Sequence, residues 1–177
     1  MDLNSLKYSG EQDRCYGVAG MTIALVAFDG EELLEGVSVE GDTGEDVALN
    51  YDFFFKGNPR MSAKFVWGRT VEHLQLSAAM MFGNLLCRRY VLGHQSSLDR
   101  ETIDFLRTIV REEGRKICSL DDDESDSIFS RSFRDAERLF THSAVHPMAH
   151  QFASILAERR SLSAAEAIDI LHRLGNR

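Results

Sequence analysis

The sequence predicts an α+β fold, in which a small N-terminal antiparallel sheet is followed by a bundle of about five helices. Short runs of β-branched and aromatic residues before residue 68 are typical of strands. After residue 70 the apolar residues recur every three to four positions, which is the period of an amphipathic helix. We therefore expect one domain over residues 1–177, with a mainly β part at about 20–68 and a helical part at about 70–175.

The first predicted strand covers residues 22–28, whose sequence TIALVAF is almost entirely apolar. It ends at Asp29-Gly30, a dipeptide that is common in turns. Residues 1–20 contain few strong signals and are expected to be an irregular lead-in. A further short strand is expected at 37–39.

The clearest β signal is an antiparallel hairpin around residues 47–67. Two aromatic-rich runs there flank the turn Gly57-Asn58-Pro59. Phe53-Phe54-Phe55 would place aromatic side chains on both faces of the first arm, because successive side chains alternate along a strand. At least one face must therefore pack against another element, and the downstream helices are the expected partner.

Five helices are expected after residue 70. The first, at 70–92, is apolar almost all round, which is typical of a helix in the middle of a bundle. Its small residues Ala78, Ala79 and Gly83 would allow neighbouring helices to approach closely. The other four helices are amphipathic. Their starts are indicated by Ser96-Ser97, by the acidic run 121–126, by Pro147 and by the capping box Ser163-Ala164-Ala165-Glu166.

The charge of the chain is unevenly distributed. It carries 28 acidic and 20 basic side chains, so its formal net charge is -8. Residues 1–60 hold 12 acidic and 4 basic side chains, whereas residues 61–177 hold 16 of each. An acidic chain lacks the basic footprint that nucleic-acid phosphates and anionic membrane surfaces require. We therefore expect neither general nucleic-acid binding nor attachment to a membrane.

The compartment expected for this chain is the cytoplasm. The N-terminus has neither a basic start nor an apolar run, so no signal peptide is expected. No stretch is long and apolar enough to predict a membrane span. The three cysteines, Cys15, Cys87 and Cys118, are odd in number and far apart, which favours reduced thiols over a disulfide framework.

Three histidines, His142, His146 and His150, follow an H-x3-H-x3-H spacing. On one continuous helix this spacing would place the imidazoles on a single face, where they could chelate zinc or nickel. Two observations weigh against such a site. Pro147 favours a helix restart at that point, and residues 138–157 contain no carboxylate to balance a divalent cation. A metal site is therefore an alternative hypothesis, and no other cofactor is expected.

Arginine accounts for 16 of the 20 basic residues. Two rows of arginines recur on the predicted helices: Arg107, Arg111 and Arg115 on the second, and Arg131, Arg134 and Arg138 on the third. A guanidinium group is a planar fork that suits carboxylate or phosphate. These rows either form local ion pairs on a solvated face or meet an acidic surface, which would belong to the sheet, to a second copy or to another partner.

No catalytic motif identifies a reaction: the chain contains no GxGxxG, no Walker A and no GxSxG sequence. The leading prediction is a non-enzymatic interaction or regulatory protein that acts through a protein partner or through self-association. The first alternative is a metal-binding protein or metal-dependent enzyme that uses the three histidines. A weaker alternative is the binding of an anionic small molecule at the arginine rows.

Overall fold

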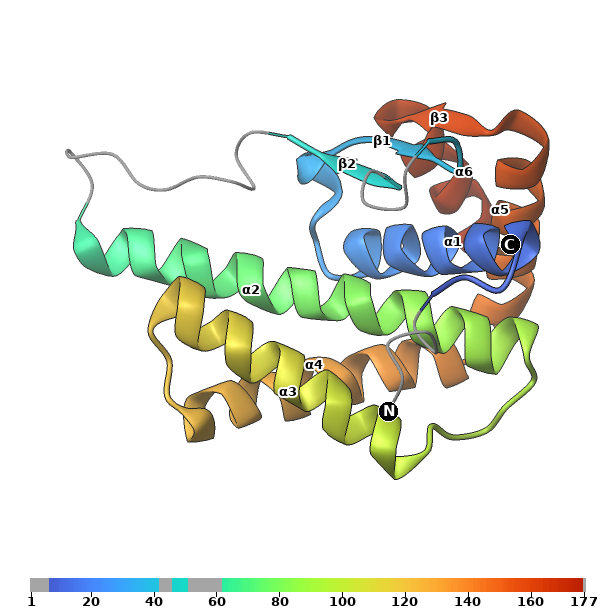
Figure 1. Cartoon of the computed structure of the whole chain (residues 1–177). Coiled ribbons are helices and arrows are strands. Elements are labelled where there is room, and N and C mark those ends of the chain that lie inside the picture. The colour runs from blue at the N-terminus through green and yellow to red at the C-terminus, as the bar shows by residue number, and fades with distance from the viewer. Residues whose placement is uncertain (1–6, 42–45, 51–61, 177) are drawn as a thin grey trace.

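The computed structural model describes residues 7–41, 46–50 and 62–176. Figure 1 shows α1 lying between the strands and α2, with α3 and α4 on the other side of α2. In chain order the elements are α1 (Glu11–Ala27), the 3-10 turn η2 (Glu31–Leu33), β1 (Leu34–Ser38), β2 (Val47–Leu49), α2 (Ala63–Leu86), the π-helix η4 (Cys87–Leu92), α3 (Arg100–Cys118), α4 (Asp122–Thr141), α5 (Val145–Arg159), β3 (Ser161–Ser163) and α6 (Ala164–Gly175).

The sheet has three antiparallel strands in the order β2-β1-β3. In the hairpin formed by β1 and β2, Val37 lies opposite Val47. On its other edge β1 pairs with β3, which places Val37 beside Leu162. The α+β class, with an N-terminal hairpin followed by a helical bundle, is therefore confirmed. The strand predicted at 37–39 overlaps the end of β1.

The strand predicted at 22–28 is wrong, because these residues belong, through Ala27, to helix α1. Helix α1 begins at Glu11, so the irregular lead-in predicted over 1–20 is also wrong from that residue onward. Residues 15–20 are buried without interruption, since α1 is enclosed by α2, α5 and the strands. A run that is apolar on every side has no period that separates a helix from a strand.

The hairpin predicted around 47–67 lies earlier in the chain than expected. Its first arm is β2, but the partner of β2 is the preceding strand β1 rather than a following one. The second arm is wrong over 63–67, because α2 begins at Ala63. The side chain of Ser62 caps this helix by accepting a hydrogen bond from the amide of Phe65. The aromatic run 53–55 and the turn after it lie outside the described residues.

All four later helices are present, but two begin away from the predicted signal: α3 starts after Asp99 rather than at Ser96-Ser97, and α5 starts before Pro147. Asp99 caps α3, Asp121 caps α4 in a capping box with Glu124, and Ser163 caps α6 in a capping box with Glu166. Helix α5 begins two residues before Pro147. None of the described helices is long and apolar enough to cross a membrane.

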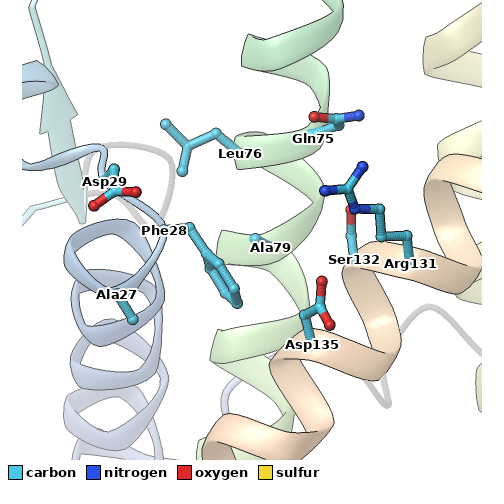
Figure 2. A pocket seen from close by; sticks show the side chains of 9 residues that line it. All are labelled: Ala27, Phe28, Asp29, Gln75, Leu76, Ala79, Arg131, Ser132 and Asp135. Atoms are coloured by element: carbon cyan, nitrogen blue, oxygen red, sulfur yellow. The ribbon is translucent and has the colours of Figure 1, made fainter.

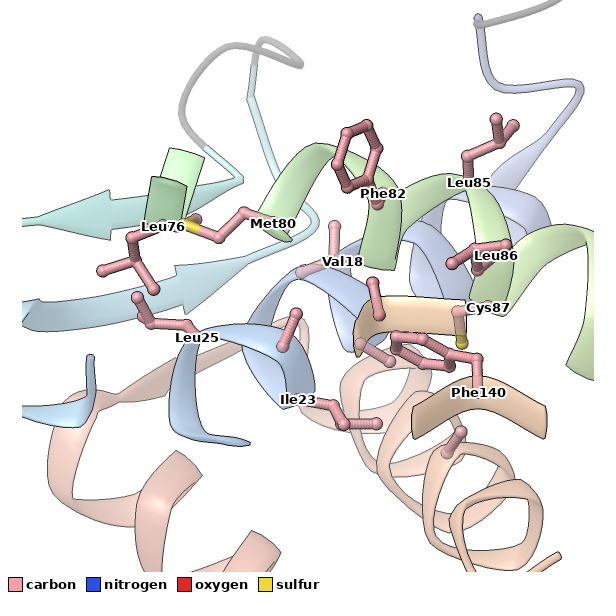
Figure 3. Packing of buried hydrophobic residues seen from close by; sticks show 14 of the residues in the cluster. Val18, Ile23, Leu25, Leu76, Met80, Phe82, Leu85, Leu86, Cys87 and Phe140 are labelled. Atoms are coloured by element: carbon pink, nitrogen blue, oxygen red, sulfur yellow. The ribbon is translucent and has the colours of Figure 1, made fainter. Parts of the chain in front are cut away.

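The core is centred on the contact between α1 and α2. Figure 3 shows apolar side chains of these two helices together with Phe140 of α4. Gly20 faces Gly83 across this contact. A Cβ atom on Gly83 would collide with the carbonyl oxygen of Gly20. The close approach predicted for Gly83 is therefore confirmed.

Candidate functional site

The arginines predicted on α3 pair with carboxylates of α4. Arg111 forks onto Asp126, with Nε 2.7 Å from Oδ1 and Nη2 2.6 Å from Oδ2. These hydrogen bonds from Arg111 hold the pKa of Asp126 below its usual value. Arg107 lies 3.6 Å from the same carboxylate, and Arg115 lies 2.7 Å from Asp122. The α3 row therefore joins two helices of the same chain.

The arginines predicted on α4 are placed differently. Arg131, Arg134 and Arg138 are exposed, and in the described part of the chain they make no ion pair. Arg131 also lines a half-open cavity of about 240 Å³, between the end of α1, the middle of α2 and α4 (Figure 2). The cavity is lined by Ala27, Phe28, Asp29, Gln75, Leu76, Ala79, Arg131, Ser132 and Asp135.

The charge of this cavity opposes the binding of anions. Figure 2 shows the guanidinium of Arg131 between Gln75 and Ser132, with the carboxylates of Asp29 and Asp135 on the walls. One cationic group and two carboxylates leave a net negative lining. The electrostatic interaction with this lining therefore favours a cationic ligand over a phosphate. The cavity gives no support to the weaker alternative, in which arginines of these rows bind an anionic small molecule.

The three predicted metal-ligating histidines each have a separate environment. His142 lies at the end of α4, where its Nδ1 accepts a hydrogen bond from the amide of Ala144 at 3.3 Å. His146 donates from Nε2 to the carbonyl oxygen of Phe140 at 2.8 Å. Nδ1 of His150 lies 2.5 Å from the hydroxyl of Tyr16 on α1. Among the residues the structure describes, no three His, Cys, Asp or Glu side chains are arranged to hold a metal ion.

The bond between Tyr16 and His150 links α1 to α5. Burial lowers the pKa of His150, and nearby His146 and His94 lower it further. Burial also raises the pKa of the Tyr16 phenol. A neutral imidazole therefore accepts the hydrogen bond that the phenol donates.

Sequence reasoning missed the exposed aromatic residues at the start of α2. Phe65 is 52% exposed and Trp67 is 49% exposed. No residue of 63–73 is buried, whereas nine residues of 74–86 are buried. We call 63–73 the free half of α2 and 74–86 its packed half. Ser62, an N-cap residue before an apolar run, was the signal that this segment is a helix rather than a strand arm.

The free half of α2 contacts the end of α3. The indole Nε1 of Trp67 donates a hydrogen bond to the carbonyl oxygen of Cys118 at 3.3 Å. The neighbouring Ile117 is itself 52% exposed. Phe65 and Trp67 are separated by about 200° around the helix axis, because each residue turns the helix by about 100°. The free half therefore presents aromatic side chains on two opposite flanks.

Sequence reasoning also missed a buried polar cluster between α1, α2, η4 and residue 46. Arg88 of η4 is 6% exposed and forks onto Asp13 of α1, with atomic distances of 2.7 and 2.6 Å. Arg14 makes a 2.5 Å ion pair with Asp46, which is 1% exposed. Tyr8 donates to the same Asp46 at 3.0 Å and accepts from Asn84 at 2.8 Å. These residues come from three segments that are far apart in sequence, so only the tertiary structure brings the segments together.

The electrostatics of the cluster follow from its burial. Burial, followed by the charge of Asp46, raises the pKa of Tyr8 to about 12. Burial would also raise the pKa of Asp13, but the hydrogen bonds from Arg88 and Ser9 outweigh it and lower this pKa. The cluster is therefore a set of ion pairs and neutral donors at physiological pH.

No protein-family model and no curated protein sequence matches this chain.

Proposed function

We propose that this protein binds a partner protein, without catalysing a reaction, by placing the free half of α2 in a groove of that partner. The observation that carries the proposal is the exposure of Phe65, Trp67 and Ile117, the large apolar residues most exposed in the described part of the chain. Isolated exposed apolar residues need no explanation, but aromatics gathered on one helix end are typical of interaction sites. Trp is also the residue type most enriched among those that dominate binding energy.

The chemistry of the partner surface follows from the free half itself. The common mode of helix recognition places an apolar helix face in a hydrophobic groove. Because the indole of Trp67 contacts the end of α3, the groove we propose covers the sides of 63–73 that α3 leaves open. Lys64 is exposed and Arg69 is partly exposed, whereas Glu72 is the one carboxylate of 63–73. Charge complementarity therefore favours a groove with an apolar floor and an acidic rim.

The compartment we propose for this binding is the cytoplasm. Cys15, Cys87 and Cys118 are all free and buried. Burial raises the pKa of all three thiols. Such cysteines behave as small apolar core residues, and free thiols are typical of proteins in a reducing environment.

Site-specific photo-crosslinking tests this proposal in the cells that produce the protein. Benzoylphenylalanine replaces Phe65 in one variant, Trp67 in a second and the exposed Thr141 of α4 in a control. We expect a discrete heteromeric adduct from positions 65 and 67 that is absent from position 141. No discrete adduct, the same adduct from position 141, or an adduct with a second copy of the chain would overturn the proposal.

The partner identified in the adduct is then tested as a purified protein. Trp67→Ala should weaken its binding by about 30-fold or more, because a central Trp contributes about 2 kcal/mol or more to an interface. Arg173→Ala, at an exposed position of α6, is the control and should leave the affinity unchanged. Replacing Lys64 and Arg69 with Glu should mainly slow association, since rim charges steer the encounter.

A further inference from the structure

A second cavity lies between η4 and the N-terminal end of the described chain, next to the buried polar cluster. It has a volume of about 270 Å³. Its lining comes from the segment before α1, from α1 itself, and from η4 with the loop after it. The lining residues are Lys7, Ser9, Asp13, Arg88, Arg89, Gly93 and Gln95.

The charge of this cavity is opposite to that of the whole chain. Its lining contains three cationic side chains and one carboxylate. The ion pair between Arg88 and Asp13 neutralises one of these cations. Lys7 and Arg89 are left, and neither has an ion pair among the described residues. A chain of net charge -8 therefore keeps a cavity with a charge of about +2.

Asp99, a carboxylate outside the lining that interacts with Arg89, already accepts hydrogen bonds at the start of α3. The hydrogen bonds from Thr102 hold the pKa of Asp99 below its usual value, and the charge of Arg89 lowers it further. The two oxygens of Asp99 accept from the amide and the hydroxyl of Thr102, at 2.8 and 2.7 Å, where they cap α3. Asp99 therefore caps α3, and the guanidinium of Arg89 remains available to a ligand in the cavity.

The wall of the cavity is held rigidly. Besides its fork to Asp13, Arg88 donates to the carbonyl oxygen of Lys7 at 2.8 Å, so the backbone beside the ammonium group is fixed. The amides of Gly93 and Gln95 donate to the carbonyl oxygens of Arg88 and Arg89, each at 2.9 Å. The π-helical turn that carries both arginines is a rare conformation, found frequently at functional sites.

We propose that this cavity binds a phosphate group, either as inorganic phosphate or as a small phosphate monoester. Two cations without an ion pair match the dianion, and both the Arg89 fork and the Lys7 point charge suit phosphate. Ser9 and Gln95 add a hydroxyl and an amide to the lining. The volume is below the range of cavities for drug-sized ligands, which limits the substituent to a few atoms.

Isothermal titration calorimetry tests this proposal, with inorganic phosphate and glycerol phosphate added at constant ionic strength over a chloride background. We expect saturable binding of one molecule per chain. The variant Lys7→Gln/Arg89→Gln should bind at least about tenfold more weakly, because it loses the charge-assisted hydrogen bonds of both cations to the dianion. The control Arg115→Gln/Lys116→Gln removes an exposed Arg and Lys at the end of α3 and should bind normally.

Amide chemical shifts locate the bound phosphate, and they should change at Gly93 and Gln95. Absence of saturable binding, equal binding by the Lys7→Gln/Arg89→Gln variant, or shifts confined to other regions would overturn the proposal. Trp67→Ala should bind phosphate as the wild type does. Failure of the phosphate site and failure of partner binding are therefore distinguishable.

Discussion

The two halves of α2 both contain large apolar side chains, but their environments are opposite. The packed half buries nine residues, and its Phe82 is fully buried with edge-to-face contacts to Phe129 and Phe133, both at 5.4 Å between ring centroids. The free half buries none and exposes Phe65 and Trp67. Figure 1 shows the reason: α1 runs beside the packed half only, and α2 extends beyond the end of α1. Apolar side chains therefore stabilise the fold in one half and remain available for binding in the other.

The largest expected effect comes from truncating one aromatic residue in each half. Phe82→Ala should lower the free energy of unfolding by about 3–5 kcal/mol, because it removes buried contacts and leaves a cavity. Phe65→Ala should change it by about 0.5 kcal/mol or less, since that ring is half exposed. Urea denaturation followed by circular dichroism measures both. Equal losses would show that the free half is as well packed as the other.

A glycine in each half gives a second test with opposite signs. Gly83→Ala places a methyl group against the backbone of Gly20 and should destabilise the protein by about 1–3 kcal/mol. Gly68→Ala meets no atom within 4 Å, and it should stabilise the helix by about 0.5–1 kcal/mol. Thermal denaturation of the two variants beside the wild type measures the difference. A stabilising Gly83→Ala would contradict the close contact of α1 with the packed half.

The smallest effect concerns the packing of α1, which lies beside the packed half, against α5. The pKa of His150 is lowered in the folded protein, so the unfolded chain binds a proton at a higher pH than the folded one. The contribution of His150 to stability is therefore complete above its unfolded pKa of about 6.5 and falls as the pH drops below that value. Urea midpoints measured between pH 5 and pH 8 should show this slope.

His150→Gln should flatten the pH dependence, because a glutamine can accept the Tyr16 hydrogen bond but does not titrate. The matched control is His142→Gln, at an exposed position. An unchanged slope in His150→Gln would assign the pH dependence to other groups.

The helices after residue 90 could be predicted because their signals are local. Asp121 with Glu124 and Ser163 with Glu166 satisfy helix-end amides a few residues away, so no distant partner is needed to place α4 and α6. The strands predicted at 22–28 and over 63–67 are wrong because the apolar residues of these runs lack a distinguishing period. Their conformation depends on what covers them, and those neighbours come from distant parts of the chain.

The candidate sites also separate into features that the local sequence indicates and features that depend on distant parts of the chain. The sequence placed arginines along α3 and α4, but it could not tell that the α3 row pairs with Asp122 and Asp126 while the α4 row stays exposed. The cavity we propose for phosphate contains none of the six predicted arginines. Its cations, Lys7 and Arg89, are 82 positions apart and meet only because α1 packs against α2 and η4.

The amino-acid sequence by itself determined the α+β class, the later helices and the acidic balance of the chain, since these follow from local hydrogen bonding, periodicity and composition. Only the tertiary structure decided which apolar residues are buried and which charges remain unpaired. The physical reason is that burial and ion pairing depend on distances between elements, which the order of residues along the chain does not contain. For α2 this meant that one continuous helix became both a core element and an exposed surface.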